Sequence, residues 1–406
     1  MLLPAQRFCY SLDTALLIRR YCGPLCYNLV QGSALSTRTK GFVVVVLCSS
    51  MICYLATKSE RYLNFMDAAK RIKYHRIPIV NGTQTFRAPL LPNCSKQIQY
   101  WGGPTFNLRD GKYYCPDINC SVSFTSQRSL SVSKKSHVII LHHLGNWNIL
   151  DFERARSTGQ ILAYMTRESP PLSFRSKDLS AFDWTITYRS SSDFPIPYGV
   201  LKKSKSTFGP NKNWAEGKTK LAAWFGSNCD RMSWPRTTFV KNLSQFINID
   251  MFGKCGNLVC KDRTCLKKIS DYKFYLALEN HLCVDYITEK MWRNAFQNDA
   301  IPVVYGATKS DYEKVAPKNS FIHVNDFLNM SSLASYLKVL DVNDTLYNSF
   351  FEWRNEWDVE TTYVPEVITA DTLCSMVKKL VNESSSAKDT TAWLKSCVKA
   401  TLPKPV

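Results

Sequence analysis

The sequence predicts an α/β protein of two domains, the second of which is doubly wound. A chain of 406 residues, of which 45% are hydrophobic and 13% aromatic, is long enough for two domains with cores of their own. Short apolar runs alternate with helical patterns along it, most clearly in the segment 272–306. A strand, a helix and a second strand in that order form a parallel unit, which indicates the α/β class.

Two short apolar runs in this segment predict buried strands. Tyr272 to Leu278 is almost entirely aromatic or aliphatic and is too short for a free-standing helix. Ile301 to Tyr305 is again short and apolar, and Gly306 ends it. Asp285 is a suitable N-cap, so a helix is predicted to begin near it. Apolar residues follow at helical spacing, at Ile287, Met291 and Ala295.

Polar residues are predicted to converge beyond the carboxyl ends of these strands, where parallel sheets bind their ligands. These residues are Glu279, Asn280, Tyr286, Glu289 and Lys290. A helix N-terminus and a lysine favour a phosphorylated ligand, because free N–H groups and an ammonium both attract negative charge. The alternative is a solvated Glu–Lys pair on an ordinary helix, and this segment alone does not exclude it.

The chain is strongly basic, with a formal net charge of +19 at pH 7. Such a charge suits nucleic acid, an acidic membrane surface or a phosphorylated substrate. Nucleic acid is not favoured, since the sequence has no arginine-rich run, zinc-finger spacing or RNA-binding signature. A scattered basic surface without a specific partner is the remaining alternative.

An apolar segment near the N-terminus predicts a membrane anchor. Phe42 to Ala56 is uncharged, although it is shorter than the roughly 20 residues of a typical spanning helix, so a buried core helix is the alternative. Basic residues flank it and dominate the preceding tail, which predicts a cytosolic N-terminus. We therefore expect residues 1–41 to be a cytosolic tail, 42–56 an uncleaved signal anchor and 57–93 a stem.

Glycosylation sequons and cysteines support this orientation. Seven sequons follow the apolar segment and none precedes it, at Asn81, Asn93, Asn119, Asn242, Asn329, Asn343 and Asn382. Ten cysteines also follow it, an even number that suits disulfides in an oxidising lumen. Cys115 and Cys120 are predicted to form a local pair. The spacing of Cys255, Cys260 and Cys265 is not that of a zinc site.

The first domain is predicted to span residues 94–205. The run Val138 to Leu141 predicts a strand, and three candidate residues follow it, namely His142, His143 and Trp147. Adjacent side chains on an extended segment point to opposite faces, so one metal ion is not expected to bind both histidines. We expect structural or substrate-contacting roles for them.

Glu168 is the candidate catalytic residue of this domain. A predicted strand, Ile161 to Met165, leads directly to it, and a Pro-Pro turn follows, so its side chain can project into a cleft. An exposed loop glutamate is the alternative. A third strand is predicted at Thr185 to Arg189, and a lysine-rich bridge, 202–220, is predicted to link the domains.

The second domain is predicted to span residues 206–360, followed by a C-terminal helical segment, 361–406. Leu221 to Phe225 predicts a strand that ends at Ser227 and Asn228, and a helix is predicted to begin at Arg236. The remaining predicted elements are a strand, Phe321 to Val324, and two amphipathic helices, Ser331 to Leu340 and Leu346 to Glu356.

Several of these segments resemble the alpha-1,3-fucosyltransferases, which transfer L-fucose from GDP-fucose to GlcNAc. The most specific are YKFYLALEN, DYITEK and IPVVYGA, and TRESP around Glu168, TYRSSSD, PYG, FIHVNDF and FFEWR are also similar to family segments. The resemblance covers roughly residues 137–357. It implies two facing Rossmann-like domains of the GT-B type, with the donor bound by the C-terminal one.

The resemblance also implies roles for matched residues. Glu168 matches the proposed general base of the family. The matched donor-binding residues are Ser227, Asn228, Arg236, Glu279, Asn280, Tyr286, Glu289 and Lys290. The segment FGKCGN, 252–257, is more similar to the invertebrate and plant subgroup that acts on the N-glycan core. Two departures are the segment Leu144 to Asn146, where the family often has Arg and an acid, and the absence of the usual C-terminal Cys-x-x-Cys.

The resemblance implies an inverting transferase that makes an alpha-1,3 linkage to GlcNAc of glycoprotein glycans, in the N-glycan core if the subgroup holds. No cofactor or metal is expected to be required, and the sequence has no Asp-x-Asp pair to hold a cation. The expected partners are GDP-fucose, a GlcNAc-containing acceptor and one membrane, and the expected location is the Golgi membrane, single-pass type II with a lumenal catalytic domain. The alternatives are an inactive anchored glycan-binding protein and a related fucosyltransferase with a different acceptor.

Overall fold

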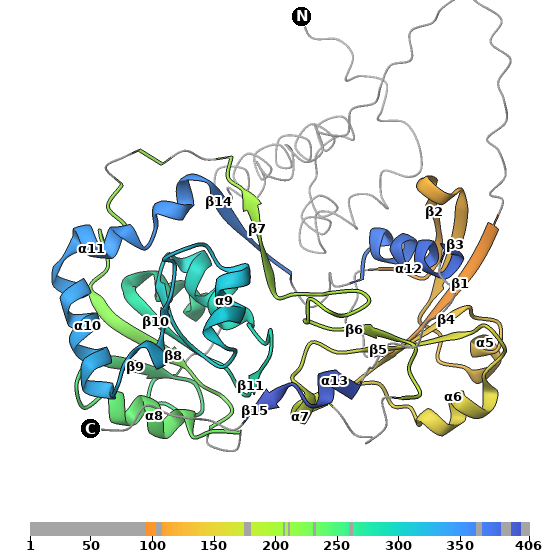
Figure 1. The fold of residues 1–406 in the computed structure, drawn as a ribbon, viewed down its shortest axis with the longest axis horizontal. Coiled ribbons are helices and arrows are strands. Elements are labelled where there is room, and N and C mark those ends of the chain that lie inside the picture. Colours follow the sequence, from red (N-terminus) through yellow and green to blue (C-terminus); the bar gives the residue numbers. More distant parts are fainter. Residues whose placement is uncertain are drawn as a thin grey trace, which may run out of the picture. The chain divides into compact units, whose positions relative to one another are not determined.

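The computed structural model describes most of the chain that follows the predicted stem (Figure 1). The described residues are 94–102, 108–173, 180–205, 208–209, 212–229, 233–259, 263–362, 368–382 and 391–398. The predicted tail, anchor and stem lie outside them, as do the sequons at Asn81 and Asn93. Within the described ranges, none of the helices has the length and apolar character needed to cross a membrane.

The first domain is built on a six-stranded sheet in the order β2-β3-β1-β4-β5-β6. Its strands are β1 (Cys94–Trp101), β2 (Gly111–Cys115), β3 (Cys120–Thr125), β4 (Val138–His142), β5 (Ile161–Met165) and β6 (Trp184–Ile186). All neighbouring strands are parallel except β2 and β3. The predicted strands at 138–141 and 161–165 are confirmed. The third ends early, at Ile186, because the hydroxyl of Thr187 accepts the Arg189 N–H and so stabilises a turn.

Helices from both ends of the described chain cover this sheet. The local ones are α5 (Leu130–Ser133), α6 (Ile149–Ala155) and α7 (Pro170–Ser173), and the C-terminal ones are α12 (Ala370–Asn382) and α13 (Thr391–Leu394). Figure 1 shows α12 beside β2 and β3. Leu373 and Met376 of α12 join the core on one face of the sheet, whereas Trp393 of α13 packs on the other face with Tyr164. The first domain is therefore completed by the C-terminal segment.

The second domain has a five-stranded, fully parallel sheet in the order β13-β12-β10-β8-β9. Its strands are β8 (Lys220–Phe225), β9 (Ile249–Phe252), β10 (Tyr272–Leu278), β12 (Ile301–Tyr305) and β13 (Ile322–His323). The predicted strands at 272–278 and 301–305 are confirmed, and the one at 321–324 is shorter because a 3-10 turn begins at Val324. Two parallel-sheet α/β domains thus confirm this part of the predicted fold.

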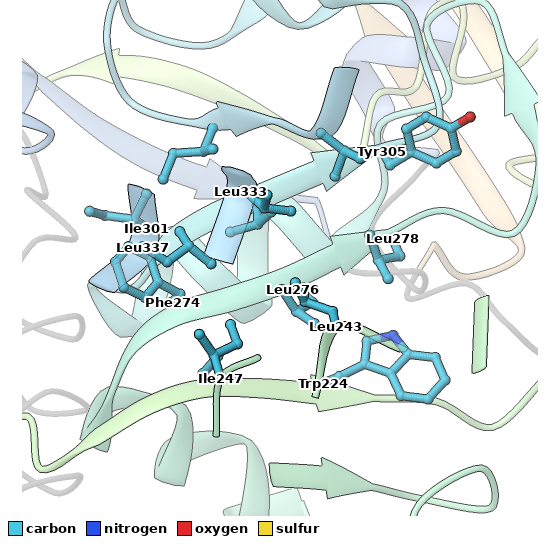
Figure 2. Packing of buried hydrophobic residues seen from close by; sticks show 14 of the residues in the cluster. Trp224, Leu243, Ile247, Phe274, Leu276, Leu278, Ile301, Tyr305, Leu333 and Leu337 are labelled. Carbon is cyan, nitrogen blue, oxygen red and sulfur yellow. The ribbon is translucent and has the colours of Figure 1, made fainter. Parts of the chain in front are cut away.

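Apolar side chains of the central strand anchor helices on both faces of the second sheet. On one face, Phe274, Leu276 and Leu278 pack with α8 (Arg236–Leu243) and α10 (Met330–Val342), as Figure 2 shows around Leu243 and Leu333. Burying such a side chain contributes about 1.5–3 kcal/mol. The other face packs against a π-helix, Lys290–Ala295. The remaining α-helices of the described second domain are α9 (Lys309–Val315) and α11 (Asp344–Ser349).

Two antiparallel ribbons join segments that are distant in sequence. β7 (Gly199–Lys203) pairs with β14 (Trp357–Thr361), and β11 (Leu282–Cys283) pairs with β15 (Cys397–Val398). Lys202 and Lys203 were expected in a linker but lie in β7, because their partners in β14 follow more than 150 residues later and leave no local signal.

Four disulfides cross-link the described residues, which is typical of proteins of the secretory pathway. They join Cys94 to Cys120, Cys115 to Cys374, Cys229 to Cys255 and Cys283 to Cys397, and Cys265 is disulfide-bonded as well. The predicted pair of Cys115 with Cys120 is wrong. α12 brings Cys374 to Cys115, and Cys120 bonds its neighbour on the parallel strand β1.

Five predicted sequons lie within the described residues. Asn343 and Asn382 are exposed, and Asn119, Asn242 and Asn329 are partly buried. Asn329 and Asn343 also serve as N-caps, of α10 and α11, through their side-chain oxygens. The amide nitrogen, which carries the glycan, is not used in either of these caps.

Candidate functional site

The candidate site lies where the strands of the second sheet end at their carboxyl edge. Glu279 follows the last residue of β10, and Gly306 follows the last residue of the neighbouring β12. A Cβ at Gly306 would lie 2.5 Å from the Glu279 Cβ. Only glycine leaves room for the glutamate side chain here, so the ends of β10 and β12 can lie this close together because residue 306 is glycine.

Glu279 is the centre of a buried polar cluster, and it is 0% exposed. Its carboxylate accepts hydrogen bonds from the Thr288 N–H at 2.8 Å, from the Thr288 hydroxyl at 2.8 and 2.9 Å, and from Lys290 Nζ at 2.9 Å. Burial raises the pKa of Glu279, although the ammonium of Lys290 acts in the opposite direction. These contacts offset part of the cost of burying the carboxylate.

Lys290 places a positive charge beside this carboxylate, with its side chain 12% exposed. Its ammonium also donates to Glu289 Oε1 at 3.2 Å and to the Thr288 hydroxyl at 2.7 Å. Burial disfavours the charge, but the two carboxylates outweigh that effect and raise the pKa of Lys290 above its ordinary value. Burial likewise opposes the charge of Glu289, but Lys290 outweighs it and lowers the pKa of Glu289. The site thus holds a protonated lysine between two carboxylates.

The helix of this unit begins later than predicted. Asp285 is not its N-cap, because Asp285 has a left-handed backbone with φ of 59° and its carboxylate accepts from the Ser190 N–H and hydroxyl. The π-helix starts at Lys290, and the Thr288 N–H, which the side chain of a capping Asp285 would accept, is bonded to Glu279 instead. The positive charge at the site therefore comes from the Lys290 ammonium rather than from a long helix that begins near Asp285.

Glu168 meets this cluster from the first domain. Three residues after β5, its Oε2 accepts a hydrogen bond from Tyr286 Oη at 3.1 Å. Burial raises the pKa of Glu168, whereas Lys290 and the Tyr286 hydroxyl act to lower it. The side chain is half-buried, so it is not the exposed loop glutamate of the alternative interpretation.

Arg236 holds the strand ends together. Its guanidinium donates to the Leu278 carbonyl at 3.0 Å and to the Asn228 carbonyl at 2.5 Å, and its side chain is 2% exposed. Ser227 and Asn228 themselves are exposed at the end of β8. The half-buried Asn280 accepts from the Ser233 hydroxyl through its carbonyl at 3.3 Å. All eight predicted donor residues therefore lie in the segments that leave the carboxyl edge of the second sheet, or contact those segments.

The histidine pair lies at the corresponding edge of the first sheet. His142 ends β4, next to β5, and its ring centroid is 4.5 Å from that of His143. The prediction that the two side chains point to opposite faces is wrong, because the strand ends at His142 and the chain turns, with the Leu144 N–H bonded to His142 Nδ1. Burial, with a contribution from His143, lowers the pKa of His142 to about 3. Within the described ranges, no three His, Cys, Asp or Glu side chains form a group that could hold a metal ion.

The side chain of Trp147 is fixed by contacts within the first domain. Its indole N–H donates to the His142 carbonyl at 2.7 Å, and its ring packs edge-on against Tyr164 and Phe182. The neighbouring Gly145 is required by this packing, since a Cβ there would lie 2.5 Å from the Trp147 ring. The segment from Leu144 to Asn146, which departs from the family pattern, therefore packs on the Trp147 ring through Gly145. The side chains of Leu144 and Asn146 are exposed.

The loop FGKCGN, 252–257, is fixed against the chain that follows β8 at the carboxyl edge of the second sheet. Gly253 has a left-handed backbone with φ of 86°, and a Cβ there would lie 2.5 Å from the Gly226 carbonyl oxygen. The Cys255 N–H donates to the same oxygen at 3.0 Å, and Cys255 is disulfide-bonded to Cys229. The loop thus supports the backbone on either side of Ser227.

Four residues of the site were missed by the sequence analysis. Thr288 fixes Glu279, and Ser169 and His281 form a hydrogen bond between the domains. Tyr198 accepts the Arg167 guanidinium over its ring at 4.0 Å and donates to the Arg167 carbonyl at 2.6 Å. The family-like segments TRESP, PYG and DYITEK contain Ser169, Tyr198 and Thr288, so His281 is the one of the four without a sequence signal.

Comparisons with known proteins identify similar chains over both domains. The family description "Glycosyltransferase family 10 (fucosyltransferase) C-term" matches residues 215–395, and "Fucosyltransferase, N-terminal" matches residues 93–199. The crystal structure of an alpha1,3-fucosyltransferase covers 75% of this chain and 94% of its own at a TM-score of 0.50 and 15% sequence identity, which supports the fold.

Curated relatives are more similar in sequence. Alpha-(1,3)-fucosyltransferase 4 of Bos taurus is 39% identical over 248 residues, which is 59% of this chain and 61% of that protein. Glycoprotein 3-alpha-L-fucosyltransferase A of Drosophila melanogaster is 34% identical over 66% of this chain and 54% of its own. The match to 4-galactosyl-N-acetylglucosaminide 3-alpha-L-fucosyltransferase 9 of Bos taurus is 33% identical and covers 78% of this chain and 86% of the relative. The chain thus spans about half to three fifths of the first two relatives.

Proposed function

Because this chain belongs to glycosyltransferase family 10, the fucosyltransferases, we propose that it transfers L-fucose from GDP-fucose to GlcNAc of glycoprotein glycans in alpha-1,3 linkage. One observation carries the proposal: Glu168 of the first domain is hydrogen-bonded to Tyr286 of the second, beside the Lys290 ammonium. A base and a cation then lie on the two sides of one reaction centre, as a transfer between two bound substrates requires.

In the proposed reaction Glu168 is the general base. The acceptor hydroxyl attacks the anomeric carbon of fucose, Glu168 Oε takes the proton of that hydroxyl, and the bond from the anomeric carbon to the β-phosphate oxygen breaks. GDP leaves with the bonding electron pair, and attack opposite to GDP inverts the anomeric configuration. The pKa of Glu168, raised by burial, makes the carboxylate a stronger proton acceptor than an exposed glutamate.

Cations of the protein are proposed to stabilise the departing diphosphate. Lys290 is protonated, and Arg236 is near enough to affect its charge. The Arg236 guanidinium is occupied by two backbone carbonyls, so it contributes its electrostatic field and holds the loop, while Lys290 is proposed to contact phosphate directly. The proposal includes no divalent metal, and a chelator is therefore expected to leave the rate unchanged.

The remaining matched residues are proposed to bind the donor. Ser227 and Asn228 are exposed at the end of β8 and are available to the nucleotide, as is Asn280 after β10. Glu289 carries a carboxylate that can accept from sugar hydroxyls once a phosphate shares Lys290. Glu279 is fully buried and is proposed to act by fixing Thr288 and Lys290.

Two acceptor classes are compatible with the similar chains. The fly relative is described as a glycoprotein fucosyltransferase, and the bovine relative as acting on a 4-galactosyl-N-acetylglucosaminide. We propose the GlcNAc of the N-glycan core, on the strength of the segment FGKCGN, with His142 and His143 as acceptor-side candidates. The proposed location is the Golgi membrane with a lumenal catalytic domain, which agrees with the four disulfides.

Incubation of the purified full chain with labelled GDP-fucose tests the proposal. The acceptors are a glycoprotein with an unsubstituted N-glycan core and a galactosyl-GlcNAc oligosaccharide, each with and without chelator. We expect incorporation into the core acceptor at the same rate in both conditions. Labelling of only the galactosyl acceptor would contradict the proposed acceptor, and no incorporation with retained glycan binding would support the anchored glycan-binding protein instead.

The variant Glu168→Gln tests the base. It keeps the size of the side chain and a hydrogen-bond acceptor for Tyr286, but its amide does not take a proton. Transfer is expected to fall by about 10²–10⁴-fold while the affinity for GDP, measured by calorimetry, remains nearly intact. Near-normal turnover would remove Glu168 from the mechanism.

A further inference from the structure

A second buried hydrogen bond joins the two domains beside the candidate base. Ser169 Oγ lies 2.8 Å from His281 Nδ1, and the two residues are 0% and 5% exposed. Ser169 follows Glu168 directly in the chain, and His281 lies two residues after Glu279. The bond therefore connects the segment that carries the base to the segment that carries the partner of Lys290.

Both partners of this bond are attached to fixed backbone. The carbonyl of Ser169, directly before α7, accepts the N–H groups of Leu172 and Ser173 in that helix. On the other side, His281 directly precedes β11, which pairs with β15 and is cross-linked to it by the Cys283–Cys397 disulfide. Because neither segment moves freely, the hydrogen bond between Ser169 and His281 fixes the distance between the two segments.

We propose that His281 and Ser169 are positioning residues that hold Glu168 against Tyr286 in the orientation needed to remove the acceptor proton. The proposal rests on the proposed function. Neither side chain needs to touch a substrate, because both are buried and bonded to each other. Their effect is transmitted through the peptide bond between Glu168 and Ser169, and a displacement of a catalytic group by about 1 Å costs on the order of 10²-fold in rate.

The charge state of His281 agrees with this role. Burial, with a contribution from the nearby Arg236, lowers the pKa of His281 and so favours the neutral ring, whose Nδ1 can accept a hydrogen bond from the Ser169 hydroxyl. A neutral ring also adds no charge next to the base. The charged and titratable groups that interact with Glu168 include Lys290, Tyr286, Glu289, Arg167 and Tyr198.

Release of this bond has a consequence for the pKa of Glu168. With Ser169 free, the segment 166–169 can move outward, and water can then reach the Glu168 carboxylate. This removes the burial that raises the pKa of Glu168. The pKa then falls towards the value of an ordinary glutamate. The acidic limb of the kcat/KM profile is therefore expected to shift to lower pH, a change that a purely structural role of His281 does not produce.

Two variants of His281 test the proposal in the full chain. His281→Leu removes the hydrogen-bonding atoms and keeps an apolar volume, whereas His281→Asn retains an amide near the position of Nδ1. For His281→Leu we expect kcat to fall by about 10–100-fold with the KM for GDP-fucose within about twofold, and for His281→Asn most of kcat to return. An unchanged kcat, or a raised KM with intact kcat, would overturn the proposal, since the latter indicates donor contact.

Ser169→Ala and the double variant form a thermodynamic cycle. If the two residues act through one bond, the double variant with His281→Leu loses no more kcat than the more damaged single variant. Additive losses contradict the proposal. His137→Leu is the matched control, because it removes a histidine Nδ1 bond, to the Gln97 N–H at 3.1 Å, at the opposite end of the sheet strands; its kcat is expected to be that of the unmodified chain.

Hydrogen–deuterium exchange separates this proposal from the proposed function. In His281→Leu, the peptide that contains residues 166–173 is expected to exchange faster than in the unmodified chain, and in His281→Asn to be restored. Unchanged exchange overturns the positioning role even if transfer is observed. An unmodified chain that transfers to no acceptor contradicts the proposed function, while the exchange result still decides whether the bond restrains Glu168.

Discussion

At the scale of single residues, the ion pair between Glu279 and Lys290 combines binding and stability in one contact. Both charged groups are buried, and Thr288 completes the hydrogen bonds of each. A buried charge left without its partner is strongly unfavourable, whereas the intact pair contributes little net stability. The same lysine is proposed to meet phosphate, so substitution of Lys290 affects folding as well as donor affinity.

Lys290→Met is therefore expected to reduce the free energy of unfolding by about 3–5 kcal/mol, because Glu279 loses its counter-charge in the interior. GDP affinity is expected to fall as well. Chemical denaturation and calorimetry measure the two effects. Lys309→Met is the control: its pair with Asp326 is half-exposed, so a loss below about 1 kcal/mol is expected. Equal losses in both variants would show that the Glu279 pair is not a buried one in solution.

The proposed role of Glu168 as the base predicts how transfer depends on pH. A base must be deprotonated to act, so activity is lost as the pH falls through its pKa. Burial raises that pKa, and we expect the acidic limb of kcat/KM above the ordinary glutamate value of about 4.3. Tyr286→Phe removes a hydrogen bond that lowers the pKa and is expected to move the limb further up. A limb at or below the ordinary value in the unmodified chain would exclude Glu168 as the titrating base.

At the scale of elements, the junction of β10 and β12 leaves no room for a side chain at Gly306. Gly306→Ala places a methyl group within 2.5 Å of the Glu279 Cβ and 2.7 Å of its Cγ. Glu279 must then leave Thr288 and Lys290, so we expect a stability loss of about 1–3 kcal/mol and weaker GDP binding. Gly111→Ala in β2 meets nothing within 4 Å and is expected to change neither. A stable Gly306→Ala variant with normal affinity would show that the strand ends can separate.

A strand or helix could be predicted from the sequence when the residues within it are sufficient to stabilise it. β5, β8, β10 and β12 are short, continuous apolar runs, because both faces of a parallel sheet are covered, and all four were predicted. β7 and β14 were not, since each is stabilised by the other at a large distance in sequence. The same reason explains the late start of the π-helix: Asp285 suits an N-cap locally, but the Glu279 side chain takes the Thr288 N–H.

The residues of the candidate site were likewise predictable where a local sequence pattern marks them, and not where only a long-range contact brings them together. Its family-like segments name Glu168, Tyr286 and Lys290, and the structure brings these residues together. The bond between Ser169 and His281 joins positions 112 residues apart, and nothing in either segment indicates that the two residues are partners. Contacts of this kind depend on how the two domains meet, which no local pattern contains.

At the scale of the whole molecule, disulfides fix the C-terminal segment to distant parts of the chain. The Cys115–Cys374 bond closes a sequence separation of 259 residues, and the Cys94–Cys120 bond one of only 26. In the chain-entropy account, a longer closed loop gives more stabilisation, by roughly 2 kcal/mol between these two lengths.

Replacement of each disulfide by two serines tests this ranking. We expect Cys115→Ser with Cys374→Ser to reduce the free energy of unfolding by up to about 5 kcal/mol, and Cys94→Ser with Cys120→Ser by about 2 kcal/mol less than that. Denaturant titration under non-reducing conditions measures both. A larger loss for the short loop would indicate that local packing around Cys120, rather than loop entropy, determines the contribution.

The return of α12 to the first sheet has a consequence for how the protein is made. Leu373 and Met376 complete a core whose strands end with β6, so this face of the sheet stays uncovered while the whole second domain is synthesised. At about 5–20 residues per second the interval is roughly tens of seconds. The nascent first domain must therefore wait until α12 has been synthesised, and a ribosome that stops before α12 releases a chain that can complete neither this core nor the Cys115–Cys374 bond.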